Sequence, residues 1–130
     1  MLARERKITA PVADPESAAF WEAAAQGKLM LRHCNACGQT HYYPRTLCPF
    51  CFSDRTEWLE ASGFGTIYSY SVMRRAEVPY AIAYVTLEEG PTMMTNIVDC
   101  DLDALKIGQE VRLTFKPSDG GPPVPMFSPA

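Results

Sequence analysis

Two pairs of cysteines constrain the fold of this chain more than any other feature. Each pair has the spacing C-x-x-C, Cys34 with Cys37 and Cys48 with Cys51, and the segment 38–47 separates the pairs. A C-x-x-C segment folds into a tight knuckle that presents two thiolates to one metal ion, and two knuckles complete a tetrahedral site. Gly38 follows the first pair, where a knuckle needs a permissive backbone. The spacing predicts one structural zinc ion in a closed site with no open position for substrate.

Other uses of these cysteines explain the pattern less well. A redox dithiol needs only one C-x-x-C and leaves the second pair unexplained. Iron in a rubredoxin-like site fits the same four sulfur ligands, although zinc is the expected metal. His33 and His41 are predicted to lie on the surface of the ribbon and not to bind the metal, because four thiolates already close the site.

The composition is typical of a soluble globular protein. Its 130 residues are 47% hydrophobic and 21% charged, which suits one domain or one domain with a small module. The net charge of −3 argues against a general binder of nucleic acid, because such proteins carry a basic excess. We expect no membrane partner, because no apolar run approaches the roughly 20 residues of a membrane span. Four of the five cysteines are assigned to a metal, which fits a reducing compartment, and the expected location is cytoplasmic.

The start of the chain is expected to contain an arm and a helix. Residues 1–13 are charged and poor in apolar side chains, so we predict a flexible arm that is ordered only where it docks on another surface. An N-cap at Asp14, followed by proline and an acid, predicts a helix that continues to Ala25. Its only bulky side chains are Phe20 and Trp21. We interpret both as core anchors, with a protein interface as the alternative.

The rest of the chain is predicted to be mainly β. Residues 14–55 are assigned to the N-terminal helix and a rubredoxin-like zinc ribbon, and residues 56–130 to a five-stranded OB-fold barrel. Three strands, a small connector and two further strands match the order of that barrel. The strands are predicted at 29–32, 39–43, 66–74, 80–87, 92–98, 111–116 and 124–127, with a short helical segment at 102–107.

The ordered combination of motifs resembles a known family. Phe20-Trp21, the two cysteine pairs, Tyr43-Pro44-Arg45 and the run from Gly63 to Tyr70 occur in the order found in zinc-ribbon OB-fold proteins associated with acyl-CoA metabolism. The likeness covers nearly the whole chain, and the combination is specific where any one motif is weak. It implies a non-catalytic or auxiliary subunit beside a thiolase-like enzyme or an enoyl-CoA hydratase, in lipid, steroid or related acyl-CoA metabolism. It also implies that the barrel binds acyl-CoA.

The sequence offers little for independent catalysis. It contains no G-x-S-x-G elbow, no phosphate-binding G-x-x-x-x-G-K-[ST] and no H-E-x-x-H helix. Cys100 is the one thiol outside the metal set. Because Asp99 and Asp101 on either side oppose its ionisation, it is interpreted as an ordinary thiol. We therefore expect an auxiliary subunit and not an enzyme.

Two function classes remain open. The first is a subunit that handles a CoA thioester, with Arg45, Arg74 and Arg75 as candidate contacts to the phosphates. The alternative is a module that binds single-stranded nucleic acid, in which Tyr68 and Tyr70, predicted to share one face of a long strand, act as stacking platforms. The acidic charge balance disfavours nucleic acid.

Overall fold

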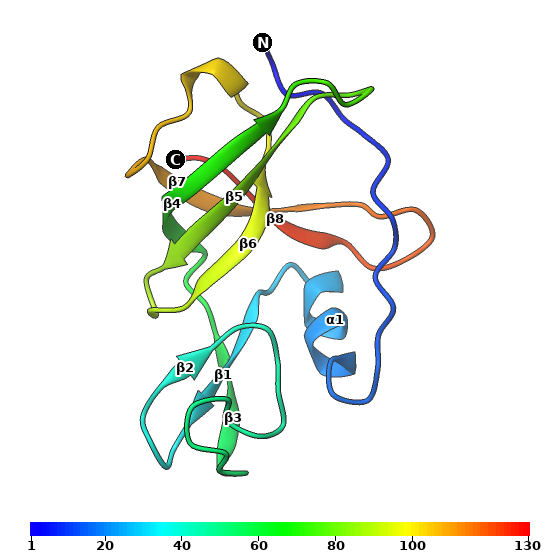
Figure 1. Cartoon of the computed structure of the whole chain (residues 1–130). Helices are drawn as coiled ribbons and strands as arrows, with labels where there is room; N and C mark the ends of the chain where they lie inside the picture. The colour runs from blue at the N-terminus through cyan, green and yellow to red at the C-terminus, as the bar shows by residue number, and fades with distance from the viewer.

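A computed structural model describes residues 1–130 as one α-helix, a three-stranded sheet and a closed five-stranded barrel (Figure 1). The sheet has the strand order β2-β1-β3, and the barrel has the order β4-β5-β6-β8-β7. The predicted fold, mainly β with a ribbon followed by an OB-fold barrel, is confirmed. No helix in the structure has the length and apolar composition needed to cross a bilayer. The elements are α1 Ala18–Ala25, β1 Met30–Cys34, β2 Thr40–His41, β3 Thr56–Glu60, β4 Phe64–Met73, β5 Tyr80–Leu87, β6 Thr92–Ile97, η1 Leu102–Ala104, β7 Glu110–Lys116 and β8 Val124–Pro129.

Helix α1 begins later than the sequence predicted. Asp14 does not cap the helix, because its carboxylate accepts the backbone N–H of Ser17 at 2.8 Å and closes a separate turn. The backbone N–H of Asp14 donates to the Ser17 hydroxyl at 3.1 Å and completes that turn. The helix starts only at Ala18 and ends before Gly27, whose φ of 78° supports the predicted stop.

The sheet of the ribbon includes a strand that the sequence patterns did not reveal. Strand β3 pairs antiparallel with β1, with Leu31 opposite Leu59. The ribbon sheet therefore runs to Glu60, and the barrel begins at Phe64. The change from ribbon to barrel falls in the short connection between these two residues.

Strand β4 contains a β-bulge that corrects the predicted pattern of its side chains. Ile67 pairs with Val85 and Ser69 with Tyr84, so Tyr68 is an extra residue in the ladder. Tyr68 is exposed, whereas Tyr70 packs against the core. The prediction that these two tyrosines share a face is wrong, because the bulge shifts the alternation by one residue.

Gly65 allows β4 to pass close to β5. A Cβ at this position would lie 2.6 Å from Val85 Cγ1 and 2.9 Å from the Thr86 carbonyl oxygen. Such distances leave no room for a side chain, so glycine is required at this point of the barrel.

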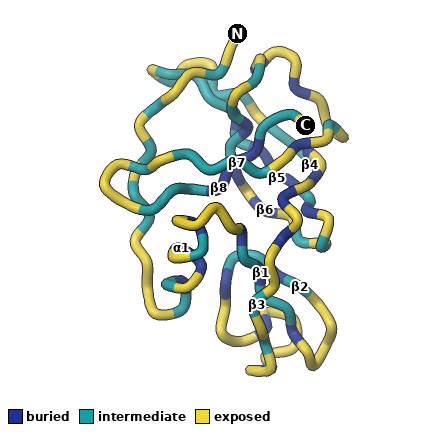
Figure 2. The backbone as a smooth tube through the Cα atoms, turned by 180° about the vertical axis from the view of Figure 1, so that it is seen from behind, coloured by how far each residue is buried: buried dark blue, intermediate teal, exposed yellow.

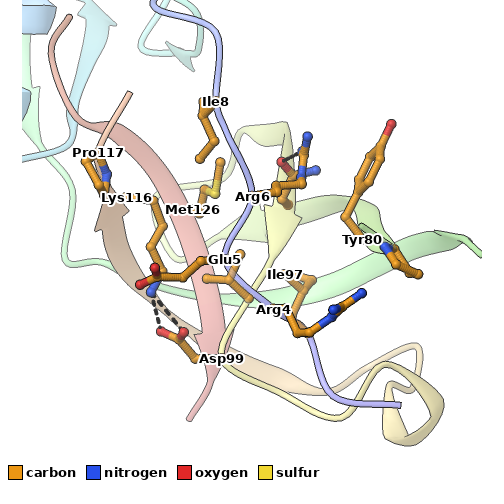
Figure 3. A pocket seen from close by; sticks show the side chains of 14 residues that line it. Arg4, Glu5, Arg6, Ile8, Tyr80, Ile97, Asp99, Lys116, Pro117 and Met126 are labelled. Atoms are coloured by element: carbon orange, nitrogen blue, oxygen red, sulfur yellow. Dashed lines mark hydrogen bonds and ion pairs between the residues drawn. The ribbon is translucent and has the colours of Figure 1, made fainter. Parts of the chain in front are cut away.

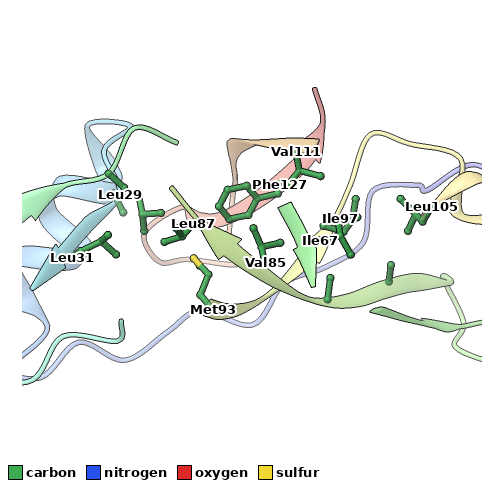
Figure 4. Packing of buried hydrophobic residues seen from close by; sticks show 14 of the residues in the cluster. Leu29, Leu31, Ile67, Val85, Leu87, Met93, Ile97, Leu105, Val111 and Phe127 are labelled. Carbon is green, nitrogen blue, oxygen red and sulfur yellow. The ribbon is translucent and has the colours of Figure 1, made fainter. Parts of the chain in front are cut away.

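One core connects the ribbon with the barrel. Leu29 and Leu31 of the ribbon belong to the same buried cluster as Leu87 and Phe127 of the barrel (Figure 4). Figure 2 shows the buried residues along the barrel strands and β1, while the tip of the ribbon is mostly exposed. The cluster consists of Phe20, Trp21, Ala24, Leu29, Leu31, Ala61, Ile67, Ala81, Ala83, Val85, Leu87, Met93, Ile97, Leu102, Leu105, Val111 and Phe127.

The N-terminal arm lies along the outside of the barrel (Figure 1). The backbone N–H of Ala3 donates to the Cys100 carbonyl at 2.8 Å, and that of Asp119 donates to the Ile8 carbonyl at 2.8 Å. Between these points the Arg6 guanidinium stacks 3.8 Å from the centroid of the Tyr80 ring. The barrel is thus the surface on which the arm docks.

Candidate metal centre and ligand surface

The two cysteine knuckles share one backbone pattern. In the first, the N–H of Cys34 donates to the Gln39 carbonyl at 2.9 Å and the N–H of Gly38 donates to the Cys34 carbonyl at 2.9 Å. In the second, Cys48 donates to Ser53 at 2.9 Å and Phe52 donates to Cys48 at 2.8 Å. The fourth residue after the first cysteine has a positive φ in both, 79° at Gly38 and 64° at Phe52. The second knuckle therefore places a bulky residue where the first has glycine.

The knuckles bring all four cysteine sulfur atoms together. The Sγ atoms of Cys34, Cys37, Cys48 and Cys51 lie within 4.8 Å of one another. Two of the separations, Cys34 to Cys51 and Cys37 to Cys48, are 3.6 Å. A tetrahedron with metal–sulfur bonds of about 2.3 Å has edges of about 3.8 Å, so the arrangement fits a tetrahedral ion such as zinc. The predicted ligand set is thus assembled around one point.

The electrostatics of the thiols also favour a bound cation. The backbone N–H of Cys37 is the main cause that lowers the pKa of the Cys34 thiol to about 7. The pKa of Cys51 is raised to about 12, although the Ser53 N–H lowers it, because desolvation and the neighbouring thiols oppose a second negative charge. A divalent cation removes this opposition and holds all four groups as thiolates.

The two histidines of the ribbon do not join the metal cluster. His33 Nδ1, on the central strand β1, lies 2.9 Å from the hydroxyl of Thr40, its partner on β2. His41 is only 3% exposed, and neither of its ring nitrogens has a hydrogen-bond partner. The prediction of a surface position is therefore wrong for His41, which β2 turns into the ribbon. Burial lowers the pKa of His41, which favours the neutral form of this side chain.

Phe20 and Trp21 belong to the core of the chain. They are 1% and 9% exposed, and the Trp21 indole N–H donates to the Tyr43 hydroxyl at 2.8 Å. The Phe20 ring packs edge-on against Trp21 at 4.8 Å and against Tyr43 at 5.1 Å between centroids. Packing accounts for both side chains, and an interface role for them stays a prediction that these contacts do not support.

The three predicted arginines lie on different parts of the molecule. Arg45 belongs to the ribbon and forms an ion pair with Glu16 at 3.4 Å. Arg74 and Arg75 lie in the connection between β4 and β5, on the side of the barrel away from the ribbon (Figure 1). Arg74 pairs with Asp103 at 2.7 Å, and the Arg75 side chain makes no ion pair or hydrogen bond. The structure brings Arg74 and Arg75 together but does not bring Arg45 to them.

A third cation, Arg6, lies near Arg74 and Arg75, and the sequence patterns did not predict it. The Arg6 guanidinium extends from the arm and stacks on Tyr80. It donates a hydrogen bond to the side-chain oxygen Oδ1 of Asn96 at 2.8 Å. Tyr80 also lines a shallow hollow with Arg74 and Arg75. The only sequence signal was the charge run at 4–7, and its position depends on how the arm docks.

Two hollows flank the stacked pair of Arg6 and Tyr80. One is a cavity of about 100 Å³ between the arm and the barrel, where Lys116 binds both carboxylate oxygens of Asp99 at 2.8 and 2.9 Å (Figure 3). The other is a groove of about 330 Å³ between the barrel and the ribbon, lined mainly by apolar side chains. The groove is lined by Arg6, Trp21, Tyr42, Tyr80, Ile82, Met94, Thr95, Asn96, Val124, Pro125 and Met126.

The remaining candidates fit ordinary structural roles. Tyr70 donates its hydroxyl to the Leu105 carbonyl at 2.7 Å and is not free to stack on a base. Cys100 is half-buried, and desolvation together with Asp101 and Asp99 raises the pKa of its thiol. A raised pKa opposes nucleophilic reactivity, as the sequence predicted.

Family models match both parts of the chain. The model of the ChsH2 rubredoxin-like zinc ribbon domain matches residues 21–57, and the model of the ChsH2 C-terminal OB-fold domain matches residues 58–116. A solved chain of the "Ltp2-ChsH2(DUF35) aldolase" is similar, with 35% identity and a TM-score of 0.79, and the match covers 92% of this chain and 98% of that chain.

Three curated relatives are similar in sequence. A probable enoyl-CoA hydratase alpha subunit of Thermomonospora curvata is 35% identical over 92% of this chain and 39% of its own length. A DUF35 domain-containing scaffold protein of Methanothermobacter thermautotrophicus is 40% identical over 64% of this chain and 68% of that protein. The benzoylsuccinyl-CoA thiolase subunit BbsA of Geobacter metallireducens is 30% identical over 65% of this chain and 59% of that protein. The chain thus spans well under half of the hydratase subunit.

Proposed function

Because this chain belongs to the family of ChsH2-type zinc-ribbon and OB-fold proteins that includes the DUF35 scaffold proteins, we propose that it is a non-catalytic subunit of an acyl-CoA enzyme. The partner is a thiolase-like or hydratase-like protein. The observation that carries the proposal is the match along both modules to proteins named as scaffolds or as subunits of CoA enzymes. The four cysteines hold one structural zinc ion in this proposal, and a set of cysteines reduced for metal binding and not joined in disulfides suits a cytoplasmic location.

The geometry of the metal site supports an auxiliary role. Four protein ligands occupy all four coordination positions of a tetrahedral ion, which leaves none for a substrate carbonyl or a water nucleophile. The ion, when bound, supplies structural cross-linking of the two knuckles. Cys34 and Cys48 are fully buried, so the knuckles enclose the site, and the core shared by Leu29 and Leu31 with the barrel holds the ribbon in place.

We assign the contacts to acyl-CoA to the side of the barrel around Tyr80. Arg74 and Arg75, with Arg6 beside them, offer cations for the phosphates of CoA. The apolar groove that begins at Tyr80 and runs toward Trp21 suits an acyl or pantetheine chain. Arg45 is paired with Glu16 on another part of the molecule, and its role as a phosphate contact stays a prediction.

Complex formation tests the proposed function. The chain is expressed alone and with a thiolase-like or hydratase-like protein encoded beside it, and the products are compared by size-exclusion chromatography with light scattering. We expect a complex that turns over its thioester, while the isolated chain turns over none. An isolated chain that catalyses thioester turnover would contradict the proposal.

Binding of CoA is measured separately by titration calorimetry. Acetyl-CoA is titrated into the complex, and the double variant Arg74→Ala with Arg75→Ala is expected to weaken binding about tenfold or more, since each charge-assisted hydrogen bond contributes about 1.5–3 kcal/mol. Arg55→Ala on the ribbon is the matched control. Equal affinities would remove this assignment. Submicromolar binding of single-stranded DNA or RNA by the isolated chain would instead favour the nucleic-acid alternative.

A further inference from the structure

Strands β4, β5 and β6 contribute no charged residue to their outer face, and the nearest cation is Arg6 of the arm, which lies on Tyr80 and Asn96 at one end of it. The three strands have 10, 8 and 6 residues, and none of these is Asp, Glu, Lys or Arg, although 21% of the whole chain is charged. The neighbouring strand β7 has the composition expected of a solvated face, with Glu110, Arg112, Thr114 and Lys116 at alternate positions. The absence of charge is therefore a property of one face and not of the barrel as a whole.

This face exposes aromatic and sulfur-containing side chains. Strand β5 alternates strictly, so Ile82 and Tyr84 point outward while Ala83 and Val85 are buried. Tyr84 lies opposite Met94 of β6, and the bulge in β4 adds Tyr68 beside it. Tyr68, Tyr84 and Met94 are 68%, 47% and 61% exposed. We name the outward side chains of Tyr68, Ser69, Ser71, Ile82, Tyr84 and Met94 the β4–β6 face.

The exposed side chains of the β4–β6 face are not covered by another part of the chain, and Arg6 of the arm packs only on Tyr80 and Asn96 at its border. Figure 1 shows the three strands side by side, with no helix drawn across them, and α1 and the ribbon lying at one end of the barrel. The apolar groove of about 330 Å³ adjoins this face, because Ile82 and Met94 line both. Residues that dominate binding energy at interfaces sit in such hollows.

We infer that the β4–β6 face is the surface on which the acyl-CoA enzyme subunit docks, an inference that rests on the proposed function. Depletion of charge with enrichment in Tyr and Met is the composition of the buried centre of a protein interface. Nucleic acid and anionic membranes fit this face poorly, because both are bound through several Lys and Arg side chains, and the face has none of its own and only Arg6 at its border. The enzyme surface that fits it is itself uncharged and apolar, since a charged group placed against it would be buried without a partner.

The apolar groove lies next to the proposed docking surface. A subunit seated on Tyr84 and Met94 closes one side of the groove that we assign to the acyl or pantetheine chain. The thioester would then lie between the two proteins, and the shared site would be complete only in the complex.

The test introduces one charge into the face of the full-length chain. Tyr84→Lys is compared with wild type for binding to the enzyme subunit that co-purifies with wild type, using biolayer interferometry. Tyr84 lines none of the hollows described above, so the assigned acyl-CoA contacts stay intact. We expect affinity to fall more than about 30-fold, as for the loss of a central interface residue. Ile107→Lys is the matched control, because Ile107 is 71% exposed but lies outside the face, and its affinity should equal that of wild type.

Photo-crosslinking identifies the occupant independently. p-Benzoylphenylalanine is placed at Tyr68, and in a separate protein at Ile107, during co-expression, and the products are identified by mass spectrometry. A crosslink from position 68 to the enzyme subunit, absent from position 107, supports the inference. A crosslink only to a second copy of this chain or to RNA overturns it.

Unchanged affinity of Tyr84→Lys also overturns the inference while leaving the proposed function in place. If no acyl-CoA enzyme subunit binds the wild-type chain, both proposals fail together. Circular dichroism and zinc content of each variant separate a loss of binding from a loss of folding.

Discussion

The two knuckles predict opposite effects for two reciprocal substitutions. Gly38 and Phe52 occupy equivalent positions, with φ of 79° and 64° and the same hydrogen bond to the first cysteine of the knuckle. Glycine adopts this left-handed conformation without strain, whereas a residue with a side chain loses about 1–2 kcal/mol. We predict that Gly38→Ala weakens the metal-bound ribbon and that Phe52→Gly strengthens it.

The magnitude follows from the surroundings of each residue. A Cβ at Gly38 would meet no atom within 4 Å, so the cost of Gly38→Ala is conformational only. Alanine also restricts the unfolded chain, which offsets about 0.4–1 kcal/mol and leaves a net cost of about 1 kcal/mol. Phe52 is 76% exposed, so removing its side chain loses little buried area. Phe52→Gly therefore stabilises the ribbon by about 1 kcal/mol. Because metal binding and folding of a ribbon are linked, each change alters the apparent zinc dissociation constant about fivefold.

Competition with a chromogenic chelator measures both effects. Zinc-loaded protein is titrated with the chelator at constant pH, and the apparent dissociation constants of the two variants are compared with wild type. Phe50→Ala is the control, because Phe50 is 55% exposed in the same knuckle but has no left-handed backbone, and it should leave zinc affinity unchanged. If Phe52→Gly weakened zinc binding as much as Gly38→Ala, the argument from backbone strain would be refuted.

Three further predictions concern the metal, the barrel and pH. Cys48→Ser should abolish stoichiometric zinc in elemental analysis and lower the melting temperature of the barrel as well, because Leu29 of the ribbon packs in the shared core; retained zinc at one ion per chain would contradict this. Gly65→Ala should destabilise the chain by about 1–3 kcal/mol in urea titration, because its Cβ would lie 2.6 Å from Val85 Cγ1. Burial lowers the pKa of His41 below its ordinary 6.5, so the unfolded chain binds the extra proton and folding stability falls as the pH drops below about 6.5. Urea titrations at several pH values in excess zinc should show a smaller loss for His41→Phe, and equal losses would remove His41 as the cause.

The sequence predicted those features that depend on local spacing. The positions of Cys34, Cys37, Cys48 and Cys51 sufficed for the metal cluster, because each knuckle closes within a few residues. The bounds of β5 followed from its own pattern of apolar residues and the turns that flank it.

Features that depend on a distant partner were predicted less well. The bulge at Tyr68 arises from the pairing of β4 with β5, which one strand's pattern does not contain. His41 was placed on the surface because its burial depends on how the ribbon folds over β2. The contact of Arg6 with Tyr80 required the path of the arm across the barrel.

The common core of ribbon and barrel has a consequence for assembly in the cell. Leu29 and Leu31 pack in the same core as the barrel, so a loss of order in the knuckles also destabilises the barrel. We assign the outer face of that barrel to the enzyme subunit. If the proposed function holds, a shortage of zinc would therefore reduce the pool of competent subunits, and with it the number of assembled enzymes, without any part for the ion in the reaction itself. Metal supply would then act on acyl-CoA turnover through quaternary structure.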